Sequence, residues 1–128
     1  MQYKLVIHGK HISLNAYIDA CRRNPRAGGR VKSASDDYVM VCISNQLRKV
    51  HIDKPVRVDF VYFCEDRKKD IDNIAGFAHK TIFDSLVKKG VLKNDSWNYV
   101  LGFTDTFYID RKDPRTEVTI TEVEYDTE

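Results

Sequence analysis

The sequence predicts an α+β fold in which a small mixed β-sheet has helices packed against it. Segments with apolar residues at every second position alternate with segments that have the three- and four-residue apolar spacing of helices. The resulting order is strand, helices, strand, helix, strand, strand. Because the chain has 128 residues, one hydrophobic core suffices, and we expect 1–128 to form a single domain.

The first strand is predicted over QYKLVIHG, whose apolar residues alternate, and it should end near Gly9. A helix should follow over SLNAYIDACRRN, because Ser13 can cap it and a helical apolar stripe comes after. Pro25, Gly28 and Gly29 are then expected to break the helical pattern.

The segment from about Asp36 to Lys49 has a less regular helical pattern and is predicted as a second helix. The stretch VMVCI inside it is equally compatible with a strand. Pro55 marks the next boundary, and the alternating run Val56–Cys64 follows. Since both faces of this run are partly apolar, we expect a largely buried strand.

The next helix should begin at Asp72 or Asn73, both good cap residues, and end at Gly90. Together with its flanking strands it is typical of a parallel pair joined by a right-handed crossover. Two final strands, around Tyr99–Ile109 and Thr116–Val123, flank the turn DRKDPR and suggest an antiparallel hairpin. The last few residues are acidic, and we expect them to be frayed.

Composition narrows the class of protein. The formal net charge is only +2, so the distribution of charge matters more than its sum. No apolar run approaches the ~20 residues that span a bilayer, and the first residues are too short and too alternating for a signal peptide. Cys21, Cys42 and Cys64 are odd in number and far apart, which is typical of reduced thiols. We therefore expect a cytoplasmic protein without a membrane partner.

Two carboxylates, Asp70 and Asp72, lie between a predicted strand and a predicted helix. In an extended chain, residues two apart point to the same side, and Mg²⁺ takes hard oxygen ligands of this kind. Asp95 comes after the predicted helix that starts at Asp72 or Asn73. The two ends of that helix are ~25 Å apart, so the sequence spacing alone does not place Asp95 near Asp70 and Asp72. A helix cap and a turn explain the same residues without metal, and the spacing leaves both interpretations open.

Basic residues gather in two places that carry glycines or flank the carboxylates. Such loops can follow a phosphate backbone, although a solvated charged loop has the same composition. A nuclease needs both cations for DNA and carboxylates for Mg²⁺. The candidate DNA-binding residues are Arg22, Arg23, Arg26, Arg30, Lys32, Arg67, Lys68 and Lys69.

Lys80 lies inside the predicted helix, eight residues after Asp72. It can pair with Asp84 four residues later, although lysine before aspartate is the weaker orientation. Alternatively, it can reach the scissile phosphate and stabilise developing charge there.

The stretch KKDIDNI…K…FDSLVKKGVLKNDSW resembles the RusA family of Holliday junction resolvases, which is common in phages and prophages. The family pattern is Asp-x-Asp-Asn, a helix with a lysine followed by Asp-x-Leu, a glycine near the helix end, and a further aspartate before a strand. These positions are Asp70, Asp72, Asn73, Lys80, Asp84, Leu86, Gly90 and Asp95. The similarity is good from about Val56 to Trp97, and SLNAYI also looks like the family's N-terminal segment.

The resemblance implies a RusA-like homodimer that binds four-way branched DNA and cuts symmetrically paired strands with Mg²⁺ as its cofactor. It implies that Asp70, Asp72 and Asp95 bind the metal and that Lys80 is the catalytic lysine. It also implies a protein that a bacterium or a phage encodes.

The sequence departs from the family pattern at two positions. Lys80 stands one helical turn further from the aspartate pair than expected, and Gly76 occupies the nearer position. Asn94 stands where an acidic pair is often seen, so Asp95 is alone. The alternative is therefore a non-catalytic DNA-binding protein of the same fold, which the displaced lysine favours. The three carboxylates argue against a non-catalytic protein, because a protein that only binds DNA gains nothing from acidic side chains that face a phosphate. A protein-interaction domain without metal is the third hypothesis.

Overall fold

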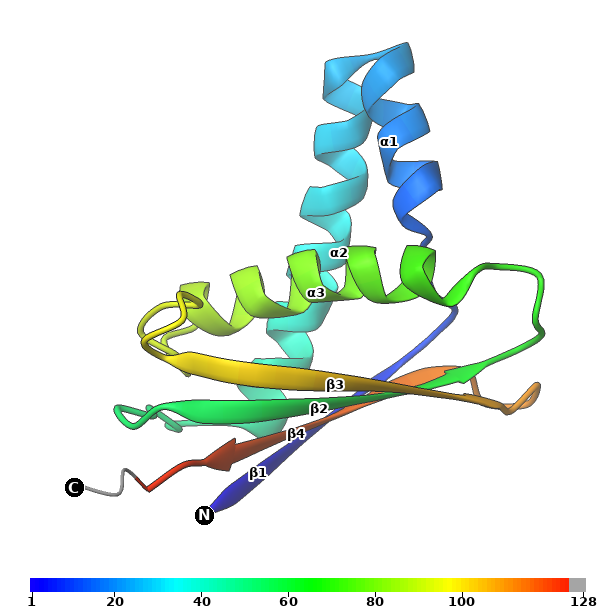
Figure 1. The fold of residues 1–128 in the computed structure, drawn as a ribbon. Helices are drawn as coiled ribbons and strands as arrows, with labels where there is room; N and C mark the ends of the chain where they lie inside the picture. Colours follow the sequence, from blue (N-terminus) through cyan, green and yellow to red (C-terminus); the bar gives the residue numbers. More distant parts are fainter. Residues whose placement is uncertain (125–128) are drawn as a thin grey trace.

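The computed structural model describes residues 1–124, and the last four residues of the acidic end expected to be frayed lie outside it. A four-stranded mixed sheet carries the helices of this part on one face, which confirms the α+β prediction (Figure 1). The elements are β1 (Gln2–His8), α1 (Leu14–Arg23), α2 (Pro25–Gln46), β2 (Val56–Cys64), α3 (Ile71–Lys88), β3 (Val100–Ile109) and β4 (Arg115–Glu122).

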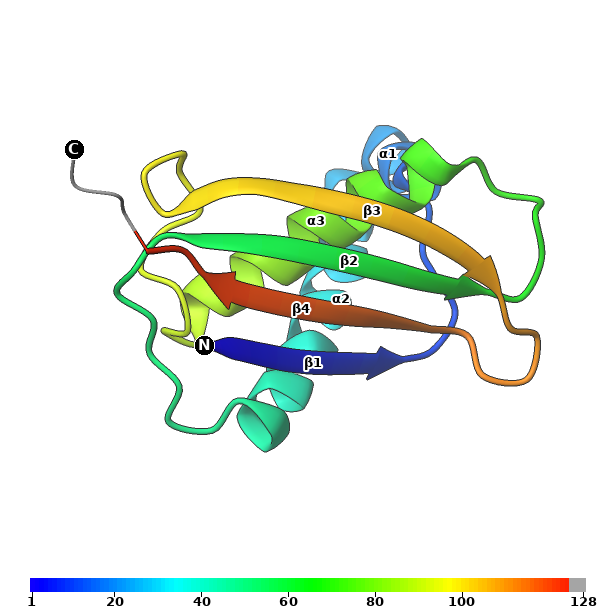
Figure 2. The same ribbon diagram turned by 60° about the horizontal axis from the view of Figure 1, so that its bottom comes forward.

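The strand order is β1-β4-β2-β3, and Figure 2 shows the four strands side by side. β2 pairs in parallel with β3, as predicted, and antiparallel with β4. The predicted antiparallel hairpin of β3 and β4 is wrong. β4 lies between β1 and β2 and does not pair with β3. The physical reason is burial: Val118 and Ile120 of β4 are fully buried, which a strand at the sheet centre allows.

Helix α1 and the first part of α2 form a hairpin that rises away from the sheet, and the rest of α2 passes α3 and packs against β1 (Figure 1). The first helix ends at Arg23, directly before Pro25, as predicted. Gly28 and Gly29 do not interrupt the helical pattern, and the second helix begins at Pro25 instead of at about Asp36 and runs through both glycines. Proline is tolerated in the first turn, and the side chain of Asn24 caps the helix by accepting from the N–H of Arg26. The stretch VMVCI belongs to α2, so the strand alternative does not apply.

Helix α3 lies across the covered face of the sheet and carries most of the core contributed by the helices. It begins at Ile71, one residue before the predicted start, and Asp70 is its N-cap. Gly90, whose φ is +74°, ends the helix as predicted, because glycine adopts this left-handed conformation without strain. Within residues 1–124 no helix is both long enough and apolar enough to cross a membrane.

The core lies between α3 and the covered face of β2. Val58, Phe60 and Tyr62 of that strand have no solvent exposure, and they pack under Ile82 and Leu86 of α3. The alternate residues of the sheet face solvent on the opposite side, where no described helix covers them (Figure 1). Residues 1–124 thus form a sheet layer and a helix layer, with one covered and one open sheet face.

Candidate functional site

A pocket of about 550 Å³ lies where β2 and β3 end and α3 begins. Its polar lining comes from the loop before α3 and the first turn of that helix. Its apolar lining comes from the last residues of β3 and from the start of α3. Residues that line the pocket include Arg67, Asp70, Ile71, Asp72, Phe107, Tyr108 and Ile109.

Asp70 and Asp72 both line this pocket and are exposed. Asp70 holds the N-cap position with extended backbone angles, yet its side chain makes no capping hydrogen bond. Asp72 lies in the first turn, where the helix dipole stabilises a carboxylate. No ion pair within residues 1–124 involves either side chain. The two carboxylates are therefore free to bind a cation from solution.

Asp95 lies in the loop between α3 and β3, at the other end of the molecule (Figure 1). The 18 residues of α3 span ~27 Å. Because β2 and β3 are parallel, with Val56 opposite Val100, the loop before β3 lies near the start of β2 and far from its end. One chain therefore does not bring Asp95 to the other two aspartates. Among residues 1–124, no three His, Cys, Asp or Glu side chains are grouped so as to hold a metal.

Lys80 is exposed on α3, ~12 Å along the helix axis from Asp72. Gly76, which occupies the nearer position, lies under α1: a β-carbon added there would be 3.0 Å from the Cδ2 atom of Leu14. A lysine at position 76 would therefore require the side chain of Leu14 on α1 to shift by a few tenths of an ångström.

The exposed arginines of the first basic group lie at the tip of the α1–α2 hairpin. They are Arg22, Arg23, Arg26 and Arg30, and within the described residues no carboxylate forms an ion pair with them. The base of the hairpin contacts α3 next to the pocket, where the rings of Tyr17 and Phe77 are 5.4 Å apart. Since α1 is ~15 Å long, the arginines extend the basic surface away from the pocket.

The second basic group, Arg67, Lys68 and Lys69, precedes Asp70 directly and is exposed. The amine of Lys69 donates to the backbone oxygen of His11 at 2.6 Å, which ties the loop to the segment after β1. The basic loop and the two carboxylates therefore share one end of the sheet.

Comparison with protein families decides the classification. A family model described as endodeoxyribonuclease RusA matches residues 28–121. The chain belongs to the RusA family. A search of curated proteins finds no match. The RusA family consists of endodeoxyribonucleases, and resolution of Holliday junctions is its activity. The matched range contains Asp70, Asp72, Lys80 and Asp95, whereas Arg22, Arg23 and Arg26 precede it.

One residue predicted to contact DNA has another partner in this RusA protein. The amine of Lys32 lies 2.8 Å from the carboxylate of Asp36 and 2.7 Å from that of Asp84. Burial disfavours the charged amine, but the hydrogen bonds with both carboxylates outweigh it and raise the pKa of Lys32. The side chain is only 18% exposed. Lys32 therefore links α2 to α3, and we remove it from the DNA-binding set. Asp84 pairs with Lys32 and not with Lys80.

Sequence analysis missed a polar group between α3 and β3. The Nε2 atom of His79 lies 2.8 Å from Asp105, and the hydroxyl of Tyr62 donates to the same carboxylate oxygen at 2.8 Å. Burial, followed by the bond with Asp105, raises the pKa of Tyr62. The available signal was spacing: His79 follows Asp72 by two helical turns, which places both on the α3 face that borders β3.

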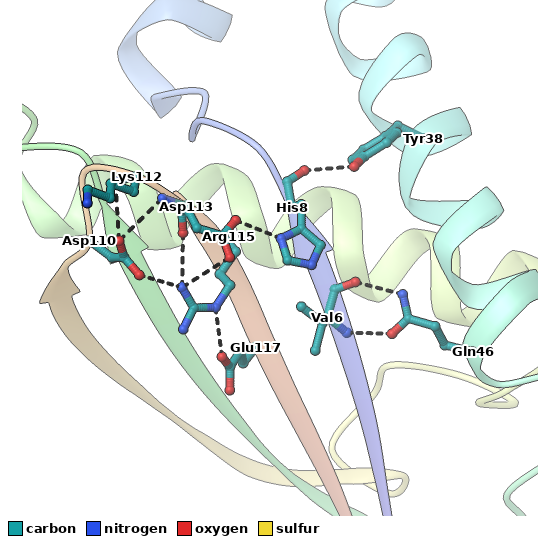
Figure 3. A network of polar contacts seen from close by, with 9 residues as sticks. All are labelled: Val6, His8, Tyr38, Gln46, Asp110, Lys112, Asp113, Arg115 and Glu117. Carbon is teal, nitrogen blue, oxygen red and sulfur yellow. Dashed lines mark hydrogen bonds and ion pairs between the residues drawn. The ribbon is translucent and has the colours of Figure 1, made fainter.

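Arg115, at the start of β4, is neutralised within the chain (Figure 3). Its guanidinium donates to Asp110 and to Glu117 at 2.9 Å each, and it lies over the ring of Phe63. These hydrogen bonds lower the pKa of both carboxylates. His8 and Asp113 extend this network to the end of β1. The network closes the loop between β3 and β4 and leaves its cation unavailable to DNA.

Proposed function

We propose that the protein is a Mg²⁺-dependent endodeoxyribonuclease that resolves four-way DNA junctions by symmetric hydrolysis of two paired strands. The observation that carries this proposal is the pair of exposed carboxylates, Asp70 and Asp72, that line one pocket without an internal partner. Membership in the RusA family supports the nuclease class. We further propose that it acts in the cytoplasm of a bacterial host, encoded by the bacterium or by a phage.

The donor set at the pocket suits Mg²⁺. Carboxylate oxygens are the ligands that this ion prefers, and it retains positions for water and for substrate phosphate. Two carboxylates held close together repel each other, and a cation between them relieves the repulsion. When bound, Mg²⁺ would activate a water for attack and stabilise charge at the phosphate. Asp70 and Asp72 would hold the ion, and the side chain of Asp70 makes no capping hydrogen bond that would compete with it.

Asp95 can join this site only from a second chain, because α3 separates it from the pocket within one chain. We therefore propose a homodimer in which Asp70 and Asp72 of one protomer act with Asp95 of its partner. A two-fold dimer contains two such sites, which suits a junction with two equivalent strands to cut.

The cations on the same side of the molecule would hold the DNA. Arg67, Lys68 and Lys69 would contact the phosphates next to the cut, and the arginines at the hairpin tip would contact an arm further away. Lys80 is exposed on the same helix as Asp72, and we propose that its amine stabilises the phosphate charge.

The position of Gly76 favours one alternative function. Because α1 covers the place where the family's lysine is expected, the chain could bind junctions without cutting them. Such a protein would keep the fold and the basic surfaces and would need no metal.

The test compares a synthetic four-way junction with a linear duplex of the same sequence, each with Mg²⁺ and with a chelator. We expect symmetric paired cuts in the junction only, and only with Mg²⁺. Undiminished cleavage in chelator would refute the metal proposal. Tight junction binding without cleavage of any branched substrate would establish the non-catalytic alternative.

A further inference from the structure

A second cavity lies at the far end of α3, between that helix and the loop that follows α2. It measures about 250 Å³, and its floor includes the buried Ile43 and Leu47. None of the described residues that line it is acidic. We call this cavity the basic pocket, after the basic residues of its lining: Arg48, Lys49, His51 and Lys89.

The loop after α2 is fastened to the end of α3 by two hydrogen bonds. The Nδ1 atom of His51 donates to the carbonyl oxygen of Gly90 at 2.8 Å, since that oxygen can only accept. The N–H of Ile52 donates to the carbonyl oxygen of Val91 at 2.9 Å. Segments 39 residues apart in the sequence therefore form one pocket, and the cations of the loop stay next to Lys89.

The arginine and the two lysines of the basic pocket are exposed, and within residues 1–124 no ion pair involves them. The surrounding lysines differ, because each of them contacts a carboxylate. These paired lysines are Lys54, Lys88 and Lys93. Like charges held around one cavity repel each other, and an anion between them relieves the repulsion. The chain thus leaves unpaired those cations that face one cavity.

Lys49 has a backbone conformation that glycine adopts more easily. Its φ is +61°, and it is the only residue other than glycine with a positive φ among residues 1–124. It is the third residue of a turn in which the N–H of Val50 donates to the carbonyl oxygen of Leu47 at 3.1 Å. Glycine or asparagine is usual at such a position, because a larger side chain makes this conformation costly. The turn alone does not explain a lysine here, whereas a role for its amine in the pocket does.

The helix ends offer a second explanation for these cations. The C-terminal ends of α2 and α3 each carry about half a negative charge, which nearby cations stabilise. Two such ends amount to about one charge, whereas Arg48, Lys49 and Lys89 are all positively charged. An excess of positive charge therefore remains at the pocket, and a bound anion would balance it.

We propose that the basic pocket binds a phosphate of the DNA backbone in an arm of the junction. Phosphate oxygens accept hydrogen bonds from arginine and lysine, and such contacts give affinity without reading the sequence. α3 separates the pocket from Asp70 and Asp72 by ~27 Å, which is about eight base pairs of duplex. The phosphate in the pocket is therefore not the one that these carboxylates face. Only the identity of the anion as DNA rests on the proposed function.

Junction binding over a salt series tests this contact. We would measure the dissociation constant of the full chain for a fluorescent four-way junction, in chelator so that no strand is cut. For the double variant Arg48→Gln, Lys89→Gln we expect an increase of about fivefold at about 0.1 M salt. The slope of the logarithm of affinity against that of salt should fall by about 1, because one phosphate contact is lost. An unchanged dissociation constant and slope would overturn the proposal.

Lys54→Gln is the matched control. It removes one exposed cation at the same end of the molecule, but that cation pairs with Glu124 and does not line the pocket. The single variants Arg48→Gln and Lys89→Gln should each weaken junction binding more than Lys54→Gln does. Equal effects of the three substitutions would show that only net charge matters, which contradicts a phosphate site in the pocket.

Lys49→Gly separates binding from a structural role. Glycine relieves the left-handed conformation and removes the amine, so we expect a melting temperature no lower than that of the wild type and weaker junction binding. A lower melting temperature with unchanged binding would assign Lys49 to the fold and contradict its role in the pocket.

Junction cleavage separates this inference from the proposed function. If the pocket variants bind and cut junctions as the wild type does, the phosphate site is wrong and the nuclease proposal stands. If the wild type binds junctions more tightly than the pocket variants but cuts none, the phosphate site stands and the nuclease proposal fails.

Discussion

The amine of Lys32 on α2 lies 2.7 Å from the carboxylate of Asp84 on α3. The same amine also contacts Asp36, a carboxylate that is only 4% exposed and accepts from the hydroxyl of Thr81. One lysine thus neutralises a buried acid and joins the two longest helices. This contact joins the helix that carries Arg26 and Arg30 to α3.

We predict that Lys32→Met destabilises the fold by about 2–3 kcal/mol, because it leaves Asp36 buried with weaker compensation. Lys88, whose amine is 3.6 Å from Asp36, limits the loss. Chemical denaturation measures the change. Arg30→Met is the matched control: it should leave stability within about 0.5 kcal/mol and weaken junction binding and its salt dependence. A stable Lys32→Met variant with weakened DNA binding would return Lys32 to the DNA-binding set.

Two adjacent glycines of α2 should respond oppositely to alanine. A β-carbon on Gly28 would collide with Cys21 of α1, whereas one on Gly29 meets nothing within 4 Å. We expect Gly28→Ala to cost about 1–3 kcal/mol through overpacking and Gly29→Ala to stabilise by about 0.8 kcal/mol through helix propensity. Thermal unfolding compares them. Equal shifts in the two variants would show that the hairpin is not packed tightly at Cys21.

Stability should depend on pH through His11. Burial, followed by the charge of Lys69, lowers the pKa of His11 below its ordinary 6.5, and its ring also contacts Thr116. Below pH 6.5 the unfolded chain binds a proton at His11 that the folded chain does not bind. The contribution of His11 to the free energy of unfolding is therefore complete above pH 6.5 and is lost as the pH falls. We expect the unfolding free energy to drop from pH 7.5 to 5.5, and less steeply in His11→Gln. The same slope in both proteins would contradict this.

Much of the fold was predictable because its signals are local. The run Val56–Cys64 is partly apolar on both faces, which predicted a largely buried strand, and β2 lies inside the sheet between β4 and β3. The hairpin of β3 and β4 was predicted wrongly, because a short turn favours neighbours in sequence. The burial of Val118 instead depends on β1 and β2, which lie far away along the chain.

The candidate site divides in the same way. Asp70 and Asp72 are two residues apart, so the sequence placed them near each other, but the extended backbone assumed for them is wrong because α3 begins at Ile71 and Asp72 lies in its first turn. Lys32 and Asp84 are 52 residues apart, and no local pattern indicates that they meet. Read locally, Gly28 looks like a helix breaker. The structure shows that its missing side chain instead makes room for Cys21 of α1. Contacts between distant residues therefore decided which cations remain free for DNA.

Asp72→Asn should bind four-way junctions and fail to cut them, because the amide keeps the shape of the side chain but is a poorer Mg²⁺ ligand. We expect at least a hundredfold loss of cleavage rate with little change in affinity. Asp53→Asn is a suitable control, since Asp53 is exposed and pairs with Lys93 away from the pocket. Wild-type cleavage by Asp72→Asn in Mg²⁺ would rule out the metal site at this pocket.

Mixed dimers would show which chain supplies Asp95. If each site combines Asp72 of one protomer with Asp95 of its partner, a dimer of one Asp72→Asn chain and one Asp95→Asn chain has one doubly altered site and one intact site. Each variant alone should be inactive, and mixing them should restore cutting of one strand, measured as nicked junction. If one chain supplies all three carboxylates, both sites of every mixed dimer are altered and mixing restores nothing.

The number of DNA strands that a mixed dimer cuts makes this experiment specific for a site shared between protomers. A mixed dimer with one working site can nick but cannot make the paired cuts that resolve a junction, so restored nicking must come without restored resolution. Unfolding and refolding the two variants together ensures exchange of protomers, and a tag on one of them isolates the mixed species. Nicking by that species, absent from either parent, is the result expected if α3 holds Asp95 away from its own chain's Asp70 and Asp72.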